Sequence, residues 1–163
     1  MADNIQSFIK ELAFEEALTN HLLGHGWNEV IMNPTEEQPV ENWARIIYDN
    51  NREIDKLGNH PLTASEMQQV MDKVNMVGSP YEMNRFINAQ EACIKRDNEA
   101  DTNNCGKEVY LKIFDPMEIS SGQSRYQIAR QPKFKTADKM GGDRRGDVML
   151  LINGMPVIHI ELK

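Results

Sequence analysis

The first half of the chain carries apolar residues at the three- and four-residue steps of amphipathic helices. In the first segment these positions are Phe8, Ile9, Leu12, Ala13, Ala17, Leu18, Leu22 and Leu23. Gly24 and Gly26 follow as stop signals. The spacing therefore predicts one helix that ends near residue 23.

Two further helices are expected before residue 77. Pro34 is suited to the first turn of the second helix, with Asn33 as a candidate cap, and its apolar stripe comprises Trp43, Ile46, Ile47 and Ile54. Thr63 and Glu66 have the spacing of a capping box, which predicts the start of a third helix. The turn residues 78–80 end it, so residues 5–77 are predicted to be helical.

The second half changes to the short β-prone runs of strands. Such runs cover residues 109–114, 126–134, 147–152 and 156–162. Asn153-Gly154 separates the last two runs and predicts a hairpin. Residues 85–96 fit either a helix or a strand, and residues 97–106 are expected to form a loop. The prediction is an α/β (α+β mixed) fold with a β-rich core at 107–163.

Length and composition place the chain among ordinary globular domains. It has 163 residues, 40% of them hydrophobic, and a formal net charge of −7, which argues against collagen-like and disordered classes. No apolar run reaches the roughly 20 residues of a membrane helix, and the first residues lack a secretory pattern. Cys93 and Cys105 are too few for a disulfide scaffold and lack zinc-site spacing, so a reducing cytoplasm is expected.

Charge is distributed unevenly along the chain. Residues 125–145 contain seven Lys or Arg and two Asp, whereas residues 1–124 contain ten basic and 21 acidic residues. A chain with this asymmetry can approach a polyanion with one face. A solvated loop beside a strand is the alternative, because the local excess is modest beside dedicated nucleic-acid binders.

The candidate chemistry lies at the C-terminal end. Asp147, Glu161 and Lys163 flank strands that are apolar enough to be buried on both faces. Charged groups there are costly unless they are paired or hold a metal. One interpretation is a structural ion pair of Lys163 with either carboxylate. The other is a Mg²⁺ site, with the lysine positioning or deprotonating a water that attacks a phosphodiester.

Asp147…Glu161-x-Lys163 resembles the PD-(D/E)xK nuclease motif. Residues 145–163, with their Asn153-Gly154-x-Pro156 turn, are similar to the nuclease core of the R (motor and restriction) subunit of type I restriction enzymes. The likeness extends more weakly to residues 14–18 followed by Gly26-Trp27, and to residues 110–115. Gly146 stands where the motif usually has proline.

The resemblance implies a role for each matching residue. Asp147 and Glu161 would ligate Mg²⁺ with the main-chain carbonyl of Leu162, and Lys163 would be the catalytic lysine. Glu15 matches a first-helix glutamate near the metal site. The alternative is that Glu15 is a solvated acid on the helix surface, and the sequence leaves open whether Glu15 or Glu16 lies nearer the site. Arg144 and Arg145 would contact DNA phosphates, which positions a duplex without reading its sequence.

The resemblance also implies a larger protein around these residues. We expect residues 1–163 to be the N-terminal part of a single endonuclease domain, with helices packed on a mixed β-sheet and truncated after the second motif strand. No phosphate-binding G-x-x-x-x-G-K-[ST] loop is present, so an ATP-driven motor would lie elsewhere. The family's helix bearing Gln-x-x-x-Tyr, which follows the nuclease core, is also expected outside these residues. Double-stranded DNA, a methyltransferase (M) subunit and a specificity (S) subunit are the implied partners, without a membrane.

Two functions follow from these alternatives. The first is a Mg²⁺-dependent endonuclease that cleaves double-stranded DNA within a type I restriction enzyme, and that we expect to be inactive or poorly active as an isolated fragment. The second is a non-enzymatic interaction module in which Asp147, Glu161 and Lys163 form a structural ion pair.

The hairpin register provides a test of the metal site. A strict two-residue loop pairs Ile152 with Met155 and, continued regularly, puts Asp147 and Glu161 on opposite faces. A three-residue loop with a bulge puts both carboxylates on one face. The metal hypothesis therefore predicts a bulged, three-residue turn.

Overall fold

The computed structural model describes residues 2–53, 57–89, 91–114, 124–134 and 144–162. These residues form two compact units, and the boundary does not follow the division into helical and β-rich halves. The first unit combines residues 1–39 with residues 125–163, and the second comprises residues 40–124. Each unit contains both helices and strands, so the chain has the predicted mixed α/β character.

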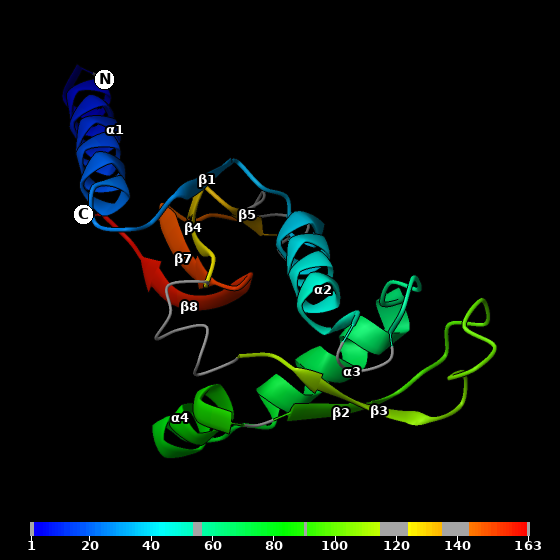
Figure 1. The fold of residues 1–163 in the computed structure, drawn as a ribbon. Coiled ribbons are helices and arrows are strands. Elements are labelled where there is room, and N and C mark those ends of the chain that lie inside the picture. The colour runs from blue at the N-terminus through cyan, green and yellow to red at the C-terminus, as the bar shows by residue number, and fades with distance from the viewer. Residues whose placement is uncertain (1, 54–56, 90, 115–123, 135–143, 163) are drawn as a thin grey trace. The chain divides into compact units, whose positions relative to one another are not determined.

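The first unit is built on a four-stranded mixed sheet in the order β1-β4-β7-β8. Strand β1 runs parallel to β4, while the β4–β7 and β7–β8 pairs are antiparallel. Figure 1 shows β7 and β8 as the orange and red hairpin near the end of the chain. The elements of this unit are α1 (Ala2–Leu23), β1 (Glu29–Met32), β4 (Tyr126–Arg130), β5 (Lys133–Phe134), β6 (Arg144–Arg145), β7 (Val148–Ile152) and β8 (Met155–Ile160).

The C-terminal part of helix α1 packs on one face of this sheet. Ile128, Val148 and Leu150 form a buried cluster on β4 and β7. The partly buried side chains packed against it are Leu18, Leu22, Trp27, Val157 and Ile160. Of the apolar residues that predict α1, Leu18 and Leu22 pack on this cluster, whereas Ile9 and Leu23 are exposed. Packing of this kind is the usual source of helix stability in proteins.

The second unit contains three helices and a two-stranded ribbon. Its elements are α2 (Glu37–Asn51), α3 (Ala64–Asn75), α4 (Pro80–Ala89), β2 (Glu91–Lys95) and β3 (Glu108–Lys112). Helix α3 lies along the antiparallel β2–β3 ribbon (Figure 1). The buried Asn51 side chain joins α2 to β3, because its amide both accepts from the Lys112 N–H and donates to the Lys112 carbonyl, at 2.8 and 2.9 Å.

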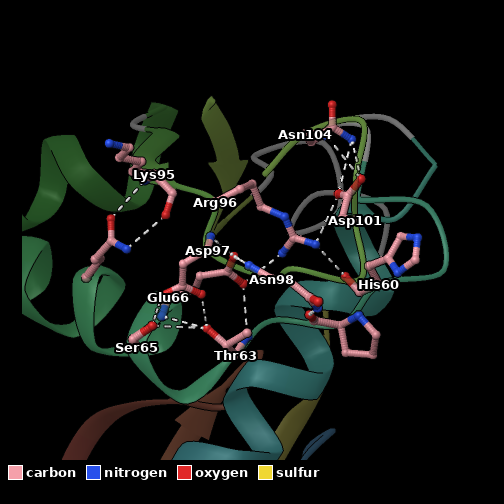
Figure 2. Close-up of polar contacts among 12 residues, drawn as sticks. His60, Thr63, Ser65, Glu66, Lys95, Arg96, Asp97, Asn98, Asp101 and Asn104 are labelled. Atoms are coloured by element: carbon pink, nitrogen blue, oxygen red, sulfur yellow. Dashed lines mark hydrogen bonds and ion pairs between the residues drawn. The ribbon is translucent and has the colours of Figure 1, made fainter. Parts of the chain in front are cut away.

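A buried ionic cluster ties the 97–107 loop to the start of α3. Figure 2 shows the Arg96 guanidinium between the Glu66 and Asp101 carboxylates. Arg96 Nη1 donates to Glu66 Oε2 at 2.7 Å and Nη2 donates to Asp101 Oδ2 at 3.3 Å. The other Glu66 oxygen accepts the main-chain N–H groups of Asp97 and Asn98. One glutamate therefore anchors the loop and, as part of the predicted capping box with Thr63, also starts the helix.

Several predicted elements are confirmed and others need correction. The three predicted helices, the 97–106 loop and the Asn153-Gly154 hairpin are present. The second helix begins at Glu37 rather than near Pro34, and Asn33 does not cap it but adopts a positive φ of 48°. The ambiguous segment 85–96 is divided, because α4 ends at Ala89 and β2 begins at Glu91.

Strand β1 contradicts the prediction that residues 5–77 are helical throughout. It is only four residues long and three of its side chains are exposed, so it has little amphipathic pattern. Its partner β4 lies almost a hundred positions later in the chain. Over the described part of the chain, none of the helices has the length and apolarity needed to cross a bilayer.

Candidate metal centre and DNA interface

The hairpin turn that precedes the candidate site has two residues. Ile152 pairs with Met155, and the intervening Asn153 and Gly154 have φ values of 50° and 84°. Two successive positive φ values are the mark of a type I′ turn, which matches the twist of the flanking strands. The predicted three-residue turn is therefore wrong.

The turn is also tied to the next strand of the sheet. Asn153 is buried, its N–H donates to the Arg125 carbonyl, and its Oδ1 accepts the Arg125 N–H, both at 2.8 Å. Asparagine suits this position for two reasons, because it tolerates the left-handed conformation and offers a side-chain acceptor.

A β-bulge lies further along β8. Leu151 pairs with Pro156, but Leu150 pairs with Ile158, so Val157 is the extra residue. Pro156 has no N–H to give to a ladder, and β8 is an edge strand, where proline and bulges are tolerated. The bulge allows Val157 and Ile160 both to pack on the core cluster.

The bulge changes the register that leads to the two candidate carboxylates. The ladder ends at the Val148–Ile160 pair, and continuing it by one residue would set Asp147 opposite Glu161. Directly opposed residues in an antiparallel pair share a face of the sheet. The register that the metal hypothesis requires is thus produced by the bulge at Val157 and not by the turn.

Asp147 is half-buried and held on both its main chain and its side chain. Its Oδ2 accepts the Leu162 N–H at 2.6 Å, and its carbonyl accepts the Gln131 N–H at 2.8 Å. Glu161 is exposed. The contact with Leu162 fixes one carboxylate beside the residues that follow β8.

Glu15 lies on α1 with its carboxylate fully engaged. Arg130 Nε donates to Oε1 at 2.7 Å and Gln131 Nε2 donates to Oε2 at 3.0 Å. The Glu15 side chain is 4% exposed and that of Arg130 is 17% exposed. Glu15, and not its exposed neighbour Glu16, is the helix acid that reaches the sheet.

Two residues that connect Glu15 to the sheet, Arg130 and Gln131, could not be identified as site residues from the sequence. Gln131 has a φ of 49°, and it joins Glu15 through its side chain to the Asp147 carbonyl through its N–H. Arg130 stands out in the sequence only as one of several basic residues. A strained non-glycine residue beside a candidate site is a common sign of function, but nothing in the local sequence indicates its left-handed conformation.

The structure describes only part of the remaining predicted site residues, Arg144, Arg145 and Lys163. Arg145 is exposed on β6, where it pairs with Lys133. The main chain of Arg144 pairs with Phe134, but the Arg144 side chain lies outside the described part of the structure. Lys163 lies wholly outside the described residues.

The carboxylates offer hard oxygen ligands but not a complete cage. Among the described residues, no three side chains of the His, Cys, Asp and Glu types gather to hold a metal. Mg²⁺ usually takes one or two carboxylates and keeps several waters. A pair of opposed carboxylates with a neighbouring main-chain carbonyl is a donor set of this kind.

The turn supplies a first testable prediction. Gly154→Ala is expected to lower the free energy of unfolding by about 1–2 kcal/mol, because a side chain disfavours the left-handed conformation. Gly24→Ala is the matched control, since Gly24 has no positive φ and its added Cβ would meet only ordinary contacts. Urea unfolding of both variants measures the difference, and equal stabilities would contradict the assigned turn.

Known proteins similar to this chain agree on one family. Residues 8–163 match the family described as type I restriction enzyme R protein N terminus. The chain is 33% identical over 153 residues to a type I restriction enzyme endonuclease subunit of Staphylococcus saprophyticus, covering 94% of this chain and 14% of the relative. Endonuclease subunits from two Staphylococcus aureus strains are each 29% identical over 157 residues, covering 96% of this chain and 15% of each relative.

The chain therefore spans about one seventh of the length of these relatives. The family match covers nearly all of its residues, including both candidate carboxylates and the part of α1 that carries Glu15. The chain belongs to the family of type I restriction enzyme R protein N termini.

Proposed function

We propose that this chain is a PD-(D/E)xK nuclease domain that hydrolyses phosphodiester bonds of double-stranded DNA with Mg²⁺. The register of β7 and β8 supports the proposal, because the last pair, Val148 and Ile160, directly precedes a position at which Asp147 would lie opposite Glu161. Membership of a restriction-enzyme family supports the same reaction class. Endonuclease is the activity in the names of the relatives.

The residues fit a magnesium ion better than a softer metal. Asp147 and Glu161 supply carboxylate oxygens, and the Leu162 carbonyl would add a third oxygen ligand. The Leu162 N–H donates to Asp147 Oδ2, so Oδ1 would be the Asp147 oxygen available to hold the ion. When bound, Mg²⁺ would stabilise charge on the phosphate and lower the pKa of a coordinated water.

The other residues would support this chemistry by position. Lys163 follows Glu161 by two positions, and its ammonium would orient the attacking water or steady the developing negative charge. Glu15 is committed to Arg130 and Gln131. It would act on the site through Gln131, whose N–H holds the Asp147 carbonyl.

The remaining functions of the enzyme belong to other parts of a larger protein. ATP-driven translocation would reside in motor domains beyond these residues, and target recognition in a specificity subunit beside a methyltransferase subunit. Arg144 and Arg145 would contact the DNA backbone here without reading sequence.

A paramagnetic metal tests the site directly. In an NMR titration of the chain with Mn²⁺ as the probe, the amide signals of residues 147 and 161–162 should broaden first. Signals from the Glu66–Arg96 cluster serve as the internal reference. Broadening that begins elsewhere, or that persists in the Asp147→Asn/Glu161→Gln double variant, would rule out this metal site and favour the structural ion-pair module.

A further inference from the structure

The short β5–β6 ribbon is a separate two-stranded sheet that follows the β4–β7 ladder past the candidate metal site. Arg130 pairs with Val148, and three more steps along each strand lead to the observed pair Lys133 and Arg145. The intervening positions are joined as well, because the Gln131 N–H donates to the Asp147 carbonyl and the Gly146 N–H donates to the Pro132 carbonyl. The ribbon is therefore one hairpin arm with β4 and β7.

The arm is held in place on its other side and at its bend. The Lys133 N–H donates to the Pro34 carbonyl at 2.9 Å, and the Asn33 N–H donates to the Arg130 carbonyl at 2.8 Å. At the bend, the left-handed Gln131 is held by its side-chain bond to Glu15. Groups on such a supported arm are positioned before a ligand arrives, which reduces the entropy lost on binding.

Two exposed cations face each other across this arm. Lys133 and Arg145 are directly paired and exposed. Within the described residues, no carboxylate forms an ion pair with either of them. Like charges directly opposite each other destabilise a strand pair. A polyanion lying across both would relieve that repulsion.

The pair also lies close in the chain to the candidate metal ligand. Arg145 is exposed and Asp147, two positions later, is half-buried, so both side chains reach solvent. At about 3.3 Å per extended residue, the main-chain positions of Arg145 and Asp147 are at most about 6.6 Å apart, or about two base steps of DNA at roughly 3.4 Å each.

We propose that Lys133 and Arg145 form a backbone clamp that holds a DNA phosphate within about two nucleotides of the bond to be cleaved. The proposal rests on the proposed nuclease function. It assigns Lys133 to the interface and sets the path of the DNA strand, which would run from Asp147 along β6. The clamp would contact phosphate oxygens only and would therefore bind any sequence.

The test compares two double variants with the same change in net charge. Lys133→Gln/Arg145→Gln removes the clamp, whereas Lys10→Gln/Lys107→Gln removes two exposed lysines that are not part of the arm. Binding of the intact polypeptide containing this chain to a 20-base-pair duplex is measured by fluorescence anisotropy. Sodium chloride is varied and divalent metal is omitted.

The expected result is a change in the salt dependence of binding. Losing two phosphate contacts should reduce the slope of log Kd against log salt by about 1.8, which corresponds to about 30-fold weaker binding at 0.15 M salt. In cleavage assays, the clamp variant should show a higher KM and an unchanged kcat. Single variants should each give about half the change in slope, so the prediction can be read even if the double variant is unstable.

The outcomes distinguish the clamp from the nuclease. An unchanged slope, or the same change in the control, would overturn the clamp even if Asp147 and Glu161 prove essential for cleavage. Weaker assembly with a protein partner at an unchanged slope would also overturn it and assign the arm to an acidic protein surface. A reduced slope in a polypeptide that shows no Mg²⁺-dependent cleavage would support the clamp while the proposed function fails.

Discussion

Replacing Asp147 with asparagine or Glu161 with glutamine is expected to reduce DNA cleavage by about a thousandfold or more. A metal ion contributes several kcal/mol of charge stabilisation in the transition state, and about 1.4 kcal/mol corresponds to a factor of ten in rate. Each substitution would remove one of the two proposed anionic ligands, so metal affinity and rate should fall together. Lys163→Ala should have a similar effect through loss of its ammonium.

The same substitutions are expected to leave the fold intact. In Asp147→Asn the side-chain amide oxygen can still accept the Leu162 N–H, and Glu161 is exposed. Cleavage is measured in the intact enzyme, and thermal unfolding is followed for each variant. Glu16→Gln, which changes an exposed acid on α1, is the control. Cleavage that survives all three substitutions, or unfolding caused by each, would instead identify Asp147, Glu161 and Lys163 as a structural ion pair.

Glu66→Ala is expected to destabilise the second unit by about 3–5 kcal/mol, because it leaves the Arg96 charge buried without its nearest partner. Both side chains of this pair are fully buried. The substitution also removes the acceptor for the Asp97 and Asn98 N–H groups and half of the capping box. The cluster therefore has a structural role, which is to anchor the 97–107 loop.

Amide hydrogen exchange gives the local measurement for Glu66→Ala. Exchange at Asp97 and Asn98 should accelerate strongly, along with the α3 amides, while β7 and β8 report on the first unit. Glu99→Gln changes an exposed acid in the same loop and should leave exchange unchanged. Unaltered protection at Asp97 in the Glu66 variant would show that the buried pair does not anchor the loop.

Asp101 sets the acid limit of the same cluster. Burial raises the pKa of Asp101, but hydrogen bonds from Asn104 and Arg96 outweigh that effect and hold the pKa below its usual value of 3.8. Because the folded pKa is depressed, the stabilisation is complete above the unfolded pKa and is lost as pH falls through the folded value. The loop should therefore remain anchored at neutral pH and loosen only below about pH 4.

Local features of the fold could be predicted because they depend on neighbouring residues. The Asn153-Gly154 hairpin follows from two positions that tolerate positive φ, and the Thr63–Glu66 capping box from a spacing of three residues. The two carboxylates stand out by their motif spacing. None of this required knowledge of which distant segments pack together.

The route to the shared carboxylate face could not be predicted. The choice lay between a regular two-residue turn and a bulged three-residue turn, whereas the protein combines a two-residue turn with a bulge at Val157. That bulge depends on Val157 and Ile160 both packing on a core made by β4 and β7. Such packing involves strands that are distant in the sequence and leaves no periodic pattern in β8.

The three helices predicted before residue 77 and the hairpin follow from the amino-acid sequence alone, since they depend on periodicity, caps and turn residues a few positions apart. The folded structure was needed to show that β1 joins β4, that Glu15 pairs with Arg130 across 115 positions, and that Lys133 opposes Arg145. The physical reason is that these contacts depend on the relative placement of distant segments, which burial of the shared core determines.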